Sequence, residues 1–579
     1  WNKAEKREIR ILWKKIQTDP KIKKIAQNIK FEDSWTRNIF KVIVQGWYWC
    51  TMNASHIIDS RGHFTSLDFQ AFIRYEVSPY NEHVKKHIKS KPGTKFNTLD
   101  QVPLDQLLMY GGMDERITKQ LWKDQEKELS TKRGLKQAYR FFHKGLVAFS
   151  DTQYIGIPID LEYYEKEDKR LEKKITKLEH KLLNGKEALL FKKETGNELK
   201  LQKDFSTKDL RELFFDILKL KPTKMTPNPK TKIPSVDHDV LSQMNNPFAK
   251  RIIQRRKLFK VKNTYLAQFK REECDGRIHP FFDLHIPRSY RSSSSMPNFQ
   301  NIPVRDKEAR KAVRQGVIPS KGRKLGLIDY SGTEVCAAAC YSKDPVLVKE
   351  ITDGIDMHQS QAKKLFKLNE KQVTKDIRFY TKNQFVFPEF YGSWYKACAY
   401  NLIETCFDLK TNDGIAVKTH LKNKGIVDSD DFMDHVKKEE KKFWDKYNVY
   451  YDWKEQSIKN YQKNGYIETF FGHRRTGYLS NNQILNTPMQ ATGFHWLLWS
   501  YIEANRESKN WKTDLIAQIH DEMIYDLDPR EESLVWGTTK DIMCNRIRER
   551  YDWIIVPLTV EIETTPVDGS WYEKSTIGI

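Results

Sequence analysis

The chain has 579 residues, of which 39% are hydrophobic, and this content excludes a wholly disordered protein. At ~150 residues per domain, the length predicts roughly three or four domains. The 100 Lys and Arg residues exceed the 77 Asp and Glu residues, for a net charge of +23. This excess favours a polyanionic partner, nucleic acid first and an anionic membrane surface second, although a solvated basic surface is the alternative.

Targeting and redox signals are weak. Every apolar stretch is shorter than the ~20 residues that span a bilayer, and the charged N-terminus lacks a signal-peptide core, so we expect a cytoplasmic protein without membrane insertion. The seven scattered cysteines contain no CxxC pair, which predicts reduced thiols and argues against a structural zinc site. Because Trp1 stands where a starting Met is usual, we expect a trimmed chain.

In chain order, residues 1–150 have a mixed α/β pattern. The segment Leu161–Leu183 predicts an amphipathic helix, since its apolar residues are spaced three and four apart. Residues 221–236 are rich in Lys, Pro and Thr and predict a loop, and helical signals resume over 240–271. Residues 276–303 are rich in turn residues and Ser.

Two carboxylates follow strand patterns. Leu325–Ser331 is an apolar strand that carries Asp329 near its end, and Ala517–Asp526 predicts a hairpin with Asp521 in its polar tip. Two such carboxylates could share two Mg²⁺ ions ~3.5–4 Å apart. For either residue alone, an ordinary turn is the more frequent explanation.

A cationic pair lies between these carboxylates in the sequence. Arg378 and Lys382 are four residues apart, so in a helix they share one face, where a triphosphate could bind. The aromatic stripe that follows could stack on a base. The alternative is a surface pair above an ordinary aromatic core.

Together these segments resemble the family A DNA polymerases, the bacterial DNA polymerase I class. Asp329-Tyr-Ser-Gly-Thr-Glu334 resembles motif A, usually DYSQIE; 378–392 resembles motif B; and His520-Asp521-Glu522 matches motif C. Three further segments, in this order, resemble RLSSxxPNLQNIP, GYxETxxGRRR and NxPxQGTA: 291–303, 465–475 and 486–493. The similarity covers about residues 20–579.

The resemblance implies a set of catalytic and nucleotide-binding residues. Asp329 and Asp521 would hold two Mg²⁺ ions, with Mn²⁺ as a substitute, and Glu522 would be a further catalytic residue. Lys382 would grip the triphosphate and donate a proton to the leaving pyrophosphate. Glu334 would be the steric gate against a ribose 2′-OH. The other implied dNTP-binding residues are Arg378, Phe387, Tyr391 and His358.

The resemblance also implies contacts to the primer–template. Arg291, Asn486 and Gln490 would touch the minor groove of the nascent pair, whose acceptor pattern is nearly independent of sequence. His520 would lie near the primer terminus. The expected partners are therefore primer–template DNA and dNTPs, bound by a monomer, with accessory replication proteins as a further option.

The chain departs from the usual motifs at several positions. Motif B has one extra residue between Lys382 and Phe387, which makes Phe385 a rival for the sugar-packing role. Ala491 replaces the Gly usual after Gln490, and Asn482 stands where many relatives have Arg. The insertion and the text of 385–392 resemble phage polymerases of this family more than bacterial ones, which would place the protein in a bacterial host cytoplasm.

The N-terminal part resembles the family's 3′–5′ exonuclease domain. Residues 27–32 resemble its second motif, NLKYD, with Glu32 in place of Asp and Asp33 as an alternative ligand. Tyr110 and Asp114 resemble its third motif, YxxxD. The first motif, a DxE pair, has no counterpart, so we expect a truncated domain that is inactive in proofreading.

The resulting fold prediction is an α/β and α+β multidomain protein. A truncated RNase H-like exonuclease domain would be followed by a right-hand polymerase with palm, fingers and thumb. The expected ranges are 1–145 for the exonuclease-like domain, 146–275 for the thumb, 276–344 and 431–579 for the palm, and 345–430 for the fingers.

The predicted activity is DNA-directed DNA polymerase, a nucleotidyltransferase of replication or repair. The rivals are a single-subunit RNA polymerase and a non-catalytic duplex-binding module.

Overall fold

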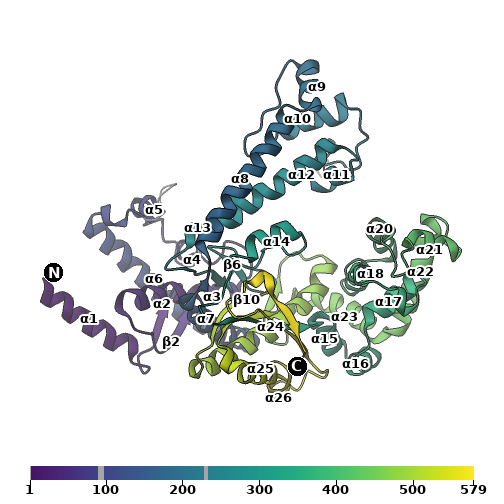
Figure 1. Cartoon of the computed structure of the whole chain (residues 1–579). Coiled ribbons are helices and arrows are strands. Elements are labelled where there is room, and N and C mark those ends of the chain that lie inside the picture. The colour runs from purple at the N-terminus through teal and green to yellow at the C-terminus, as the bar shows by residue number, and fades with distance from the viewer. Residues whose placement is uncertain (1, 89–96, 227–231, 579) are drawn as a thin grey trace.

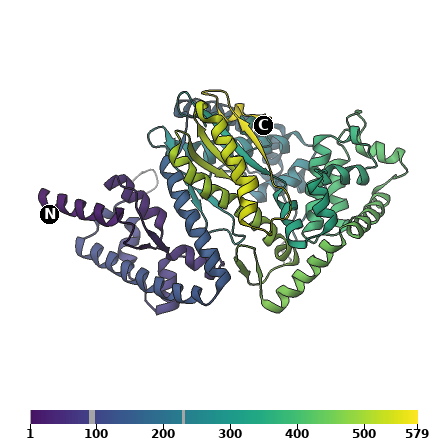
Figure 2. The same ribbon diagram turned by 90° about the horizontal axis from the view of Figure 1, so that it is seen from below.

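The computed structural model describes residues 2–88, 97–226 and 232–578. A central antiparallel sheet and its helices connect three further parts: an N-terminal part, a long helical projection and a helical lobe (Figure 1). The N-terminal part and the lobe lie on opposite sides of the sheet, and a second view from below gives the same arrangement (Figure 2).

The central sheet has five antiparallel strands in the order β10-β11-β7-β12-β13. Their bounds are β7 Lys324–Ser331, β10 Asp514–Ile519, β11 Glu522–Leu527, β12 Thr559–Thr564 and β13 Ser575–Ile577. The middle strand, β7, is buried almost continuously because helices cover both faces of the sheet. Gly326 is required there, since a Cβ at this position would lie 2.6 Å from the ring of Trp536.

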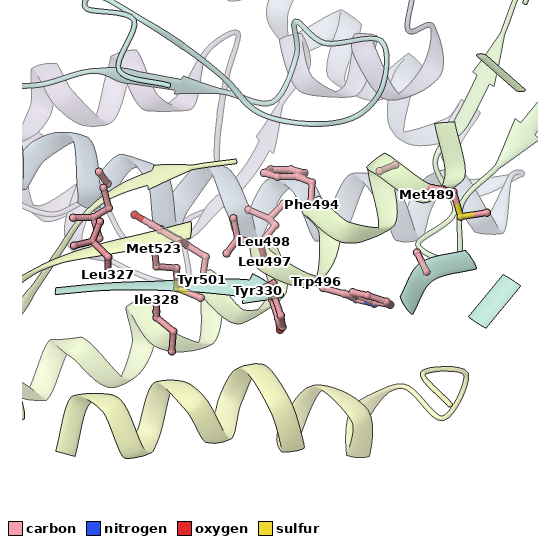
Figure 3. Close-up of a cluster of buried hydrophobic side chains, with 14 of the residues drawn as sticks. Leu327, Ile328, Tyr330, Met489, Phe494, Trp496, Leu497, Leu498, Tyr501 and Met523 are labelled. Carbon is pink, nitrogen blue, oxygen red and sulfur yellow. The ribbon is translucent and has the colours of Figure 1, made fainter. Parts of the chain in front are cut away.

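The main core lies between this sheet and the buried helix α24 (Asn481–Glu507). Leu327 and Ile328 point to opposite faces of β7, and the side chains of Phe494 and Leu498 from α24 pack above the strand (Figure 3). The hydroxyl of Tyr330 donates to the carbonyl oxygen of Met543 at 2.8 Å. The sequence prediction of a strand followed by a distant hairpin is confirmed. The helices and turns around this core are α14 Lys307–Arg314, α15 Thr333–Ser342, α25 Glu532–Asp541, η8 Ile542–Arg546 and α26 Ile547–Arg550.

The helical projection is built on α8 (Leu161–Leu183) and α12 (Pro247–Lys260), which pack along each other and extend away from the sheet (Figure 1). The predicted amphipathic helix is confirmed, because Leu171, Ile175 and Leu182 on α8 are buried. A separate small core at the tip joins the ends of α8 and α12 to α9 Lys186–Thr195, α10 Thr207–Arg211, η2 Glu212–Ile217 and α11 His238–Gln243. The predicted loop has no helix or strand over 221–226 and 232–236, and its remainder lies outside the described residues.

The helical lobe follows α15 along the chain. Its helices are α16 Pro345–Thr352, α17 Met357–Leu365, α18 Lys375–Thr381, η5 Lys382–Val386, α19 Phe387–Phe390, α20 Tyr395–Cys406, α21 Val417–Asn423 and α22 Ser429–Lys446. The helix α23 (Asn448–Asn464) returns the chain to the sheet and packs against α15 and α24. Because α22 packs on α17 and α20, the boundary expected at residue 430 falls inside a helix of the lobe.

The N-terminal part is mostly helical. Its helices are α1 Lys3–Thr18, α2 Ile29–Phe40, α3 Thr51–Ile58, α4 Leu67–Tyr75, α5 Glu82–Ile88 and α6 Leu104–Ser130, and its parallel strands are β1 Lys24–Ala26 and β2 Trp47–Cys50. The helix α7 (Arg133–Ile155) packs against both α2 and α24, so it runs through the boundary expected at residue 145.

Short elements complete the fold. They are η1 Leu99–Gln101, the pair β3 Ile157–Pro158 and β4 Arg277–Ile278, the pair β5 Phe281–Asp283 and β6 Ser293–Ser295, η3 Val261–Leu266, α13 Ala267–Glu272, η4 Glu370–Gln372, the pair β8 Tyr466–Glu468 and β9 Arg474–Thr476, η6 Ser508–Asn510, η7 Pro529–Glu531 and η9 Trp571–Glu573. Within the three described ranges, we find no helix with the length and apolar character needed to cross a membrane.

Candidate functional site

Two predicted carboxylates meet at the end of the central sheet where β10 turns into β11. We call this end of the strands the sheet edge. Asp329 lies on β7, where the strand register places it between Glu522 on β11 and Glu561 on β12. Asp521 lies in the tight turn between β10 and β11, and its carbonyl oxygen accepts a hydrogen bond from the backbone N–H of Tyr330 at 3.3 Å. Sheet pairing therefore brings together two side chains that are far apart in the sequence.

The Asp329 carboxyl is poorly compensated in the protein alone. Its Oδ1 atom is buried without a hydrogen-bond partner. Burial raises the pKa of Asp329 to about 8, and the negative charges of Glu522 and Asp521 add to this effect. A divalent cation would remove this penalty, because opposite charge favours the ionised carboxylate. Asp329 and Asp521 therefore fit a metal site.

The donor set indicates which cation would fit. Across the described part of the chain, no group of three or more His, Cys, Asp or Glu residues is placed to hold a metal ion by itself. Two carboxylates that leave other positions to water and substrate phosphates match the usual binding of Mg²⁺. The site is therefore suited to a metal that arrives with a phosphate ligand.

Glu522 is directed toward a different partner. The Nζ atom of Lys574 lies 3.4 Å from its carboxylate and also forms an ion pair with Glu563 on β12. The guanidinium of Arg314 faces the same carboxylates and stacks at 4.0 Å on the ring of Trp571. Burial raises the pKa of Glu522, while Lys574 and Arg314 favour its ionised form. The predicted catalytic role of Glu522 stays a prediction.

The predicted cationic pair lies on the helical lobe. Arg378 on α18 forms an ion pair with Asp356, whose carboxylate also caps α17 by accepting from the Gln359 N–H at 3.0 Å. His358 follows this cap, and burial lowers its pKa to about 4, helped by the charges of Lys382 and Arg378. A neutral His358 therefore lies beside two cations.

A π-helical turn determines which aromatic residue joins this group. The turn η5 (Lys382–Val386) accommodates an extra residue between α18 and α19, as π-turns do. Lys382 Nζ lies 5.0 Å from the Phe387 ring centroid, and the rings of His358 and Phe387 are 5.6 Å apart. The rival Phe385 is fully buried and packs edge-on against Phe443. Phe387, unlike Phe385, thus shares a face with Lys382.

Glu334 on α15 connects the two groups. Its carboxylate lies 3.9 Å from the guanidinium of Arg291. Burial raises the pKa of Glu334, which also experiences the charges of Asp521 from the sheet and Lys382 from the lobe. Burial and the nearby Glu334 charge raise the pKa of Tyr391. The acidic and cationic groups therefore face one common space.

Two of the predicted DNA-contacting residues, Arg291 and His520, lie beside this space. The pKa of His520 is lowered by burial and then by the charge of Arg291, so these two side chains are neighbours. Asn486 and Gln490 lie one turn apart on α24 and are half-buried. The Oδ1 atom of Asn486 is buried without a hydrogen-bond partner, so it retains an unused acceptor.

The exonuclease-like residues divide into two environments. Glu32, Tyr110 and Asp114 line a cavity of about 1190 Å³ in the N-terminal part. Asp33, offered as an alternative ligand, faces the interior instead, where Arg37 binds it at 2.7 Å and the Ser150 hydroxyl donates to it at 2.5 Å. Consecutive residues of α2 point to different sides of the helix, so Asp33 lies away from the cavity that Glu32 lines.

Carboxylates are concentrated in this cavity. Desolvation raises the pKa of Glu32, and the charges of Asp114 and Glu115 raise it further. Asp68 also lines the cavity. Burial raises the pKa of Asp114, and the charge of Asp68 raises it further. Sequence analysis missed Asp68 and Glu115 because isolated acidic residues on helices carry no pattern. It also missed Lys574, which precedes an edge strand, and Thr333, which lies inside motif A.

The chain matches a protein-family model. The model of DNA polymerase family A matches residues 162–412 and 431–573, which is more than half of the chain. The chain belongs to this family. The matched ranges contain both carboxylates of the sheet edge, the cationic pair and Glu334, and they exclude the N-terminal part.

Two curated family A relatives cover almost the whole chain. DNA polymerase I of Borreliella burgdorferi is 26% identical over 588 residues, covering 96% of this chain and 56% of the relative. DNA polymerase I of Chloroflexus aurantiacus is 24% identical over 583 residues, covering 97% and 56%. The chain thus spans little more than half the length of these relatives.

A solved structure shares the fold. The POL domain of Pol1 from M. smegmatis, in complex with DNA primer-template and dNTP, aligns with a TM-score of 0.73 at 20% identity. The alignment covers 99% of this chain and 89% of the other. The family A polymerase fold predicted from the motifs is therefore confirmed, whereas no comparison tests the exonuclease-like domain or the site residues.

Proposed function

We propose that this chain is a template-directed DNA polymerase that adds dNTPs to a primer 3′-OH by a two-metal mechanism. The observation that carries the proposal is the position of Glu334. It experiences both the carboxylate of Asp521 on the sheet and the ammonium of Lys382 on the lobe. A metal-binding edge and a phosphate-binding face across one space are what phosphoryl transfer from a triphosphate requires.

In the proposed reaction, the primer 3′-oxygen forms a bond to the α-phosphorus of the dNTP. The bond from that phosphorus to the bridging oxygen breaks, pyrophosphate leaves and the 3′-OH proton passes to solvent. Asp329 and Asp521 would hold the Mg²⁺ ions, which supply charge neutralisation when bound. Lys382 and Arg378 would bind the triphosphate, and Lys382 would place its proton at the leaving oxygen.

The remaining residues would select and position the substrates. Phe387 would pack on the incoming sugar, and Tyr391 with His358 would complete the nucleotide pocket. Glu334 would occupy the space of a ribose 2′-OH. The minor-groove and primer contacts would come from Arg291, Asn486, Gln490 and His520.

The right-hand division follows from the same proposal. The sheet and α24 would form the palm, the lobe containing α16–α22 the fingers, and the α8–α12 projection the thumb. Primer–template DNA would be bound by these three parts together, which accords with the net charge of +23. The Pol1 domain of similar fold holds DNA primer-template and dNTP. We propose that the chain acts as a monomer in the cytoplasm, with phage origin as the favoured source.

We propose that the N-terminal part does not proofread in this chain. Glu32, Tyr110 and Asp114 line its cavity and resemble the second and third exonuclease motifs. The DxE pair of the first motif, which would supply further carboxylates for two-metal hydrolysis, is absent from residues 1–26 of this sequence. A primer with a 3′ mismatch should therefore persist without nucleotides.

A primer-extension assay tests these proposals together. We expect Mg²⁺-dependent extension of a matched primer with dNTPs, little extension with NTPs, and no shortening of a mismatched primer. Preferential NTP incorporation would favour the RNA polymerase alternative. Duplex binding without any extension, with either Mg²⁺ or Mn²⁺, would favour a non-catalytic binding module and contradict the polymerase proposal.

A further inference from the structure

A threonine contacts one of the two sheet-edge carboxylates. The hydroxyl of Thr333 donates a hydrogen bond to Oδ2 of Asp521 at 3.0 Å. Thr333 is the first residue of α15 and is 5% exposed, so water competes little for this contact. Asp521 itself lies in a turn whose preceding residue, His520, has a φ of +51°. The hydrogen bond therefore fixes a side chain at the tip of a hairpin.

The backbone before Thr333 supports this geometry. Gly332 adopts a left-handed φ of +65°, and its carbonyl oxygen accepts the first hydrogen bonds of α15 from Val335 and Cys336. Glycine adopts this conformation at low cost. The chain can therefore turn sharply from β7 into α15, which places Thr333 beside Asp521.

A glycine on α24 makes room for Thr333. A Cβ at Gly493 would lie 3.1 Å from the Cβ and 3.2 Å from the Oγ1 of Thr333. Contacts this short force a neighbour to shift. The usual motifs, DYSQIE and NxPxQGTA, have Ile and Ala where this chain has Thr333 and Gly493. The hydroxyl and the space for it thus occur together in this sequence.

We propose that Thr333 is a positioning residue for the metal-binding carboxylate of Asp521, and that Gly493 holds it in place. The Thr333 hydroxyl is hydrogen-bonded to Oδ2 of Asp521, and Oδ1 of the same carboxylate is left to bind a cation. The hydrogen bond therefore orients the carboxylate before the metal and the nucleotide bind. Second contacts of this kind commonly orient metal ligands and increase metal affinity. This inference rests on the proposed polymerase function, in which Asp521 binds a metal.

The principal test compares Thr333→Val with Thr333→Ser. Valine keeps the shape but removes the donor, whereas serine keeps the donor.

Mn²⁺ affinity is measured by electron paramagnetic resonance on the complex with dideoxy-terminated primer–template and dNTP, which binds metal without turnover. Mg²⁺ dependence of single-nucleotide incorporation is measured in parallel with an extendable primer. Thr333→Val should weaken Mn²⁺ binding about tenfold, the scale of one hydrogen bond to a charged group. Thr333→Ser should stay within about twofold of the wild type.

A matched control separates orientation from general destabilisation. Thr539→Val removes a buried hydroxyl that contacts Tyr525 at 3.1 Å on the helix α25, away from the sheet edge. This variant should keep wild-type Mn²⁺ affinity even if its melting temperature falls. Equal losses of Mn²⁺ affinity in Thr333→Val and Thr539→Val would overturn the proposal, as would unchanged affinity in Thr333→Val.

A double-mutant cycle tests the role of Gly493. Gly493→Ala should weaken Mn²⁺ binding in the wild-type background but add little when Thr333 is already alanine, because the displaced hydroxyl is then absent. Additive losses would overturn the role assigned to Gly493. Failure of the polymerase proposal is recognised separately, since the wild type would then show no extension while the Mn²⁺ comparison could still be made.

Discussion

Asp33 and Arg37 form an ion pair of 2.7 Å whose side chains are only 1% and 6% exposed. Arg37 also binds Asp151 on α7 at 2.6 Å, so this pair joins α2 to the helix that continues toward the sheet. Breaking a buried pair leaves an uncompensated charge. The acidic residue offered as an alternative metal ligand in the sequence is therefore part of a buried ion-pair network between α2 and α7.

Substitution of Asp33 should destabilise the protein. We expect Asp33→Asn to lower the free energy of unfolding by about 3 kcal/mol, the lower end for breaking a buried pair, because Asp151 still neutralises Arg37. The adjacent Glu32→Gln, which faces the cavity, is the control and should change stability by less than about 0.5 kcal/mol. Urea denaturation measures both. Equal effects of the two substitutions would contradict the assignment of Asp33 to the interior.

The two phenylalanines around the π-turn should behave in opposite ways. Phe385→Ala removes a fully buried ring and should cost about 3–5 kcal/mol of stability. Phe387→Ala should cost less stability but raise the KM for dNTP by roughly tenfold or more, the scale of one lost stacking contact. Denaturation and single-nucleotide kinetics check the pair. A larger KM effect at Phe385 would show that the other ring faces the nucleotide.

A cluster of buried histidines predicts acid sensitivity. The rings of His473 and His495 are 4.3 Å apart, and Tyr290 separates His473 from His56 on α3. Burial lowers the pKa of His56 and of His495 to about 3, and lowers that of His473 as well. All three are therefore neutral in the folded protein at neutral pH.

The sign of the pH dependence follows from these shifts. Below pH ~6.5 the unfolded chain binds protons that the folded protein excludes, so stability is complete above ~6.5 and falls as the pH drops toward 3. We expect His473→Phe to reduce the change in the free energy of unfolding with pH by up to about 1.4 kcal/mol per pH unit. Denaturation between pH 5 and 7.5 measures the change, with exposed His180→Phe as the control. An unchanged slope in His473→Phe would contradict the prediction.

Neutralising Asp329 should separate catalysis from folding. Asp329→Asn should abolish primer extension, since it removes a metal-binding charge, while duplex affinity stays within about twofold. Because burial and the nearby carboxylates disfavour its charge, the substitution should not lower the stability of the metal-free protein. Asp514→Asn, at the far end of β10, breaks a pair with Arg323 and should retain extension. Robust extension by Asp329→Asn would refute the metal assignment.

Removing the Glu334 side chain should relax sugar selection. We expect Glu334→Ala to lower the ratio of kcat/KM for dNTP over NTP by at least about tenfold, the scale of losing one steric contact in a pocket. Glu334→Asp, which retains the charge on a shorter side chain, should have an intermediate effect. Steady-state incorporation of paired dNTP and NTP substrates measures the ratio. An unchanged ratio in Glu334→Ala would show that Glu334 does not act as the steric gate.

The sequence predicted those parts of the protein whose patterns are local. The helix at 161–183, the strand with Asp329 and the hairpin with Asp521 follow from apolar spacing, and the ordered motifs identified the family. The pairing of β7 with β11 depends on contacts across the whole chain, so only the resemblance indicated it. The motif comparison revealed one extra residue between Lys382 and Phe387 but not the π-turn that absorbs it, so only the three-dimensional structure distinguishes the surroundings of Phe385 and Phe387.

Other features depended on three-dimensional surroundings. Asp33 and Glu32 are adjacent acidic residues that the sequence does not distinguish. Asp33 faces Arg37 and Glu32 faces a cavity, because consecutive side chains on an α-helix point about 100° apart. Lys574 reaches Glu522 only because β13 joins the sheet beside β12. The expected boundaries at 145 and 430 fall inside continuous helices, which composition does not reveal.

The π-turn makes chain length, as well as residue identity, a determinant of the nucleotide face. Phe387 is five residues after Lys382, a spacing that would place the two side chains about 140° apart on an uninterrupted α-helix. The wider π-turn absorbs the fifth residue and returns Phe387 to the side of Lys382 and His358. Deleting Asn383 or Gln384 would restore a spacing of four, which keeps both side chains on one face of a regular α-helix, whereas one further inserted residue would turn Phe387 away from Lys382.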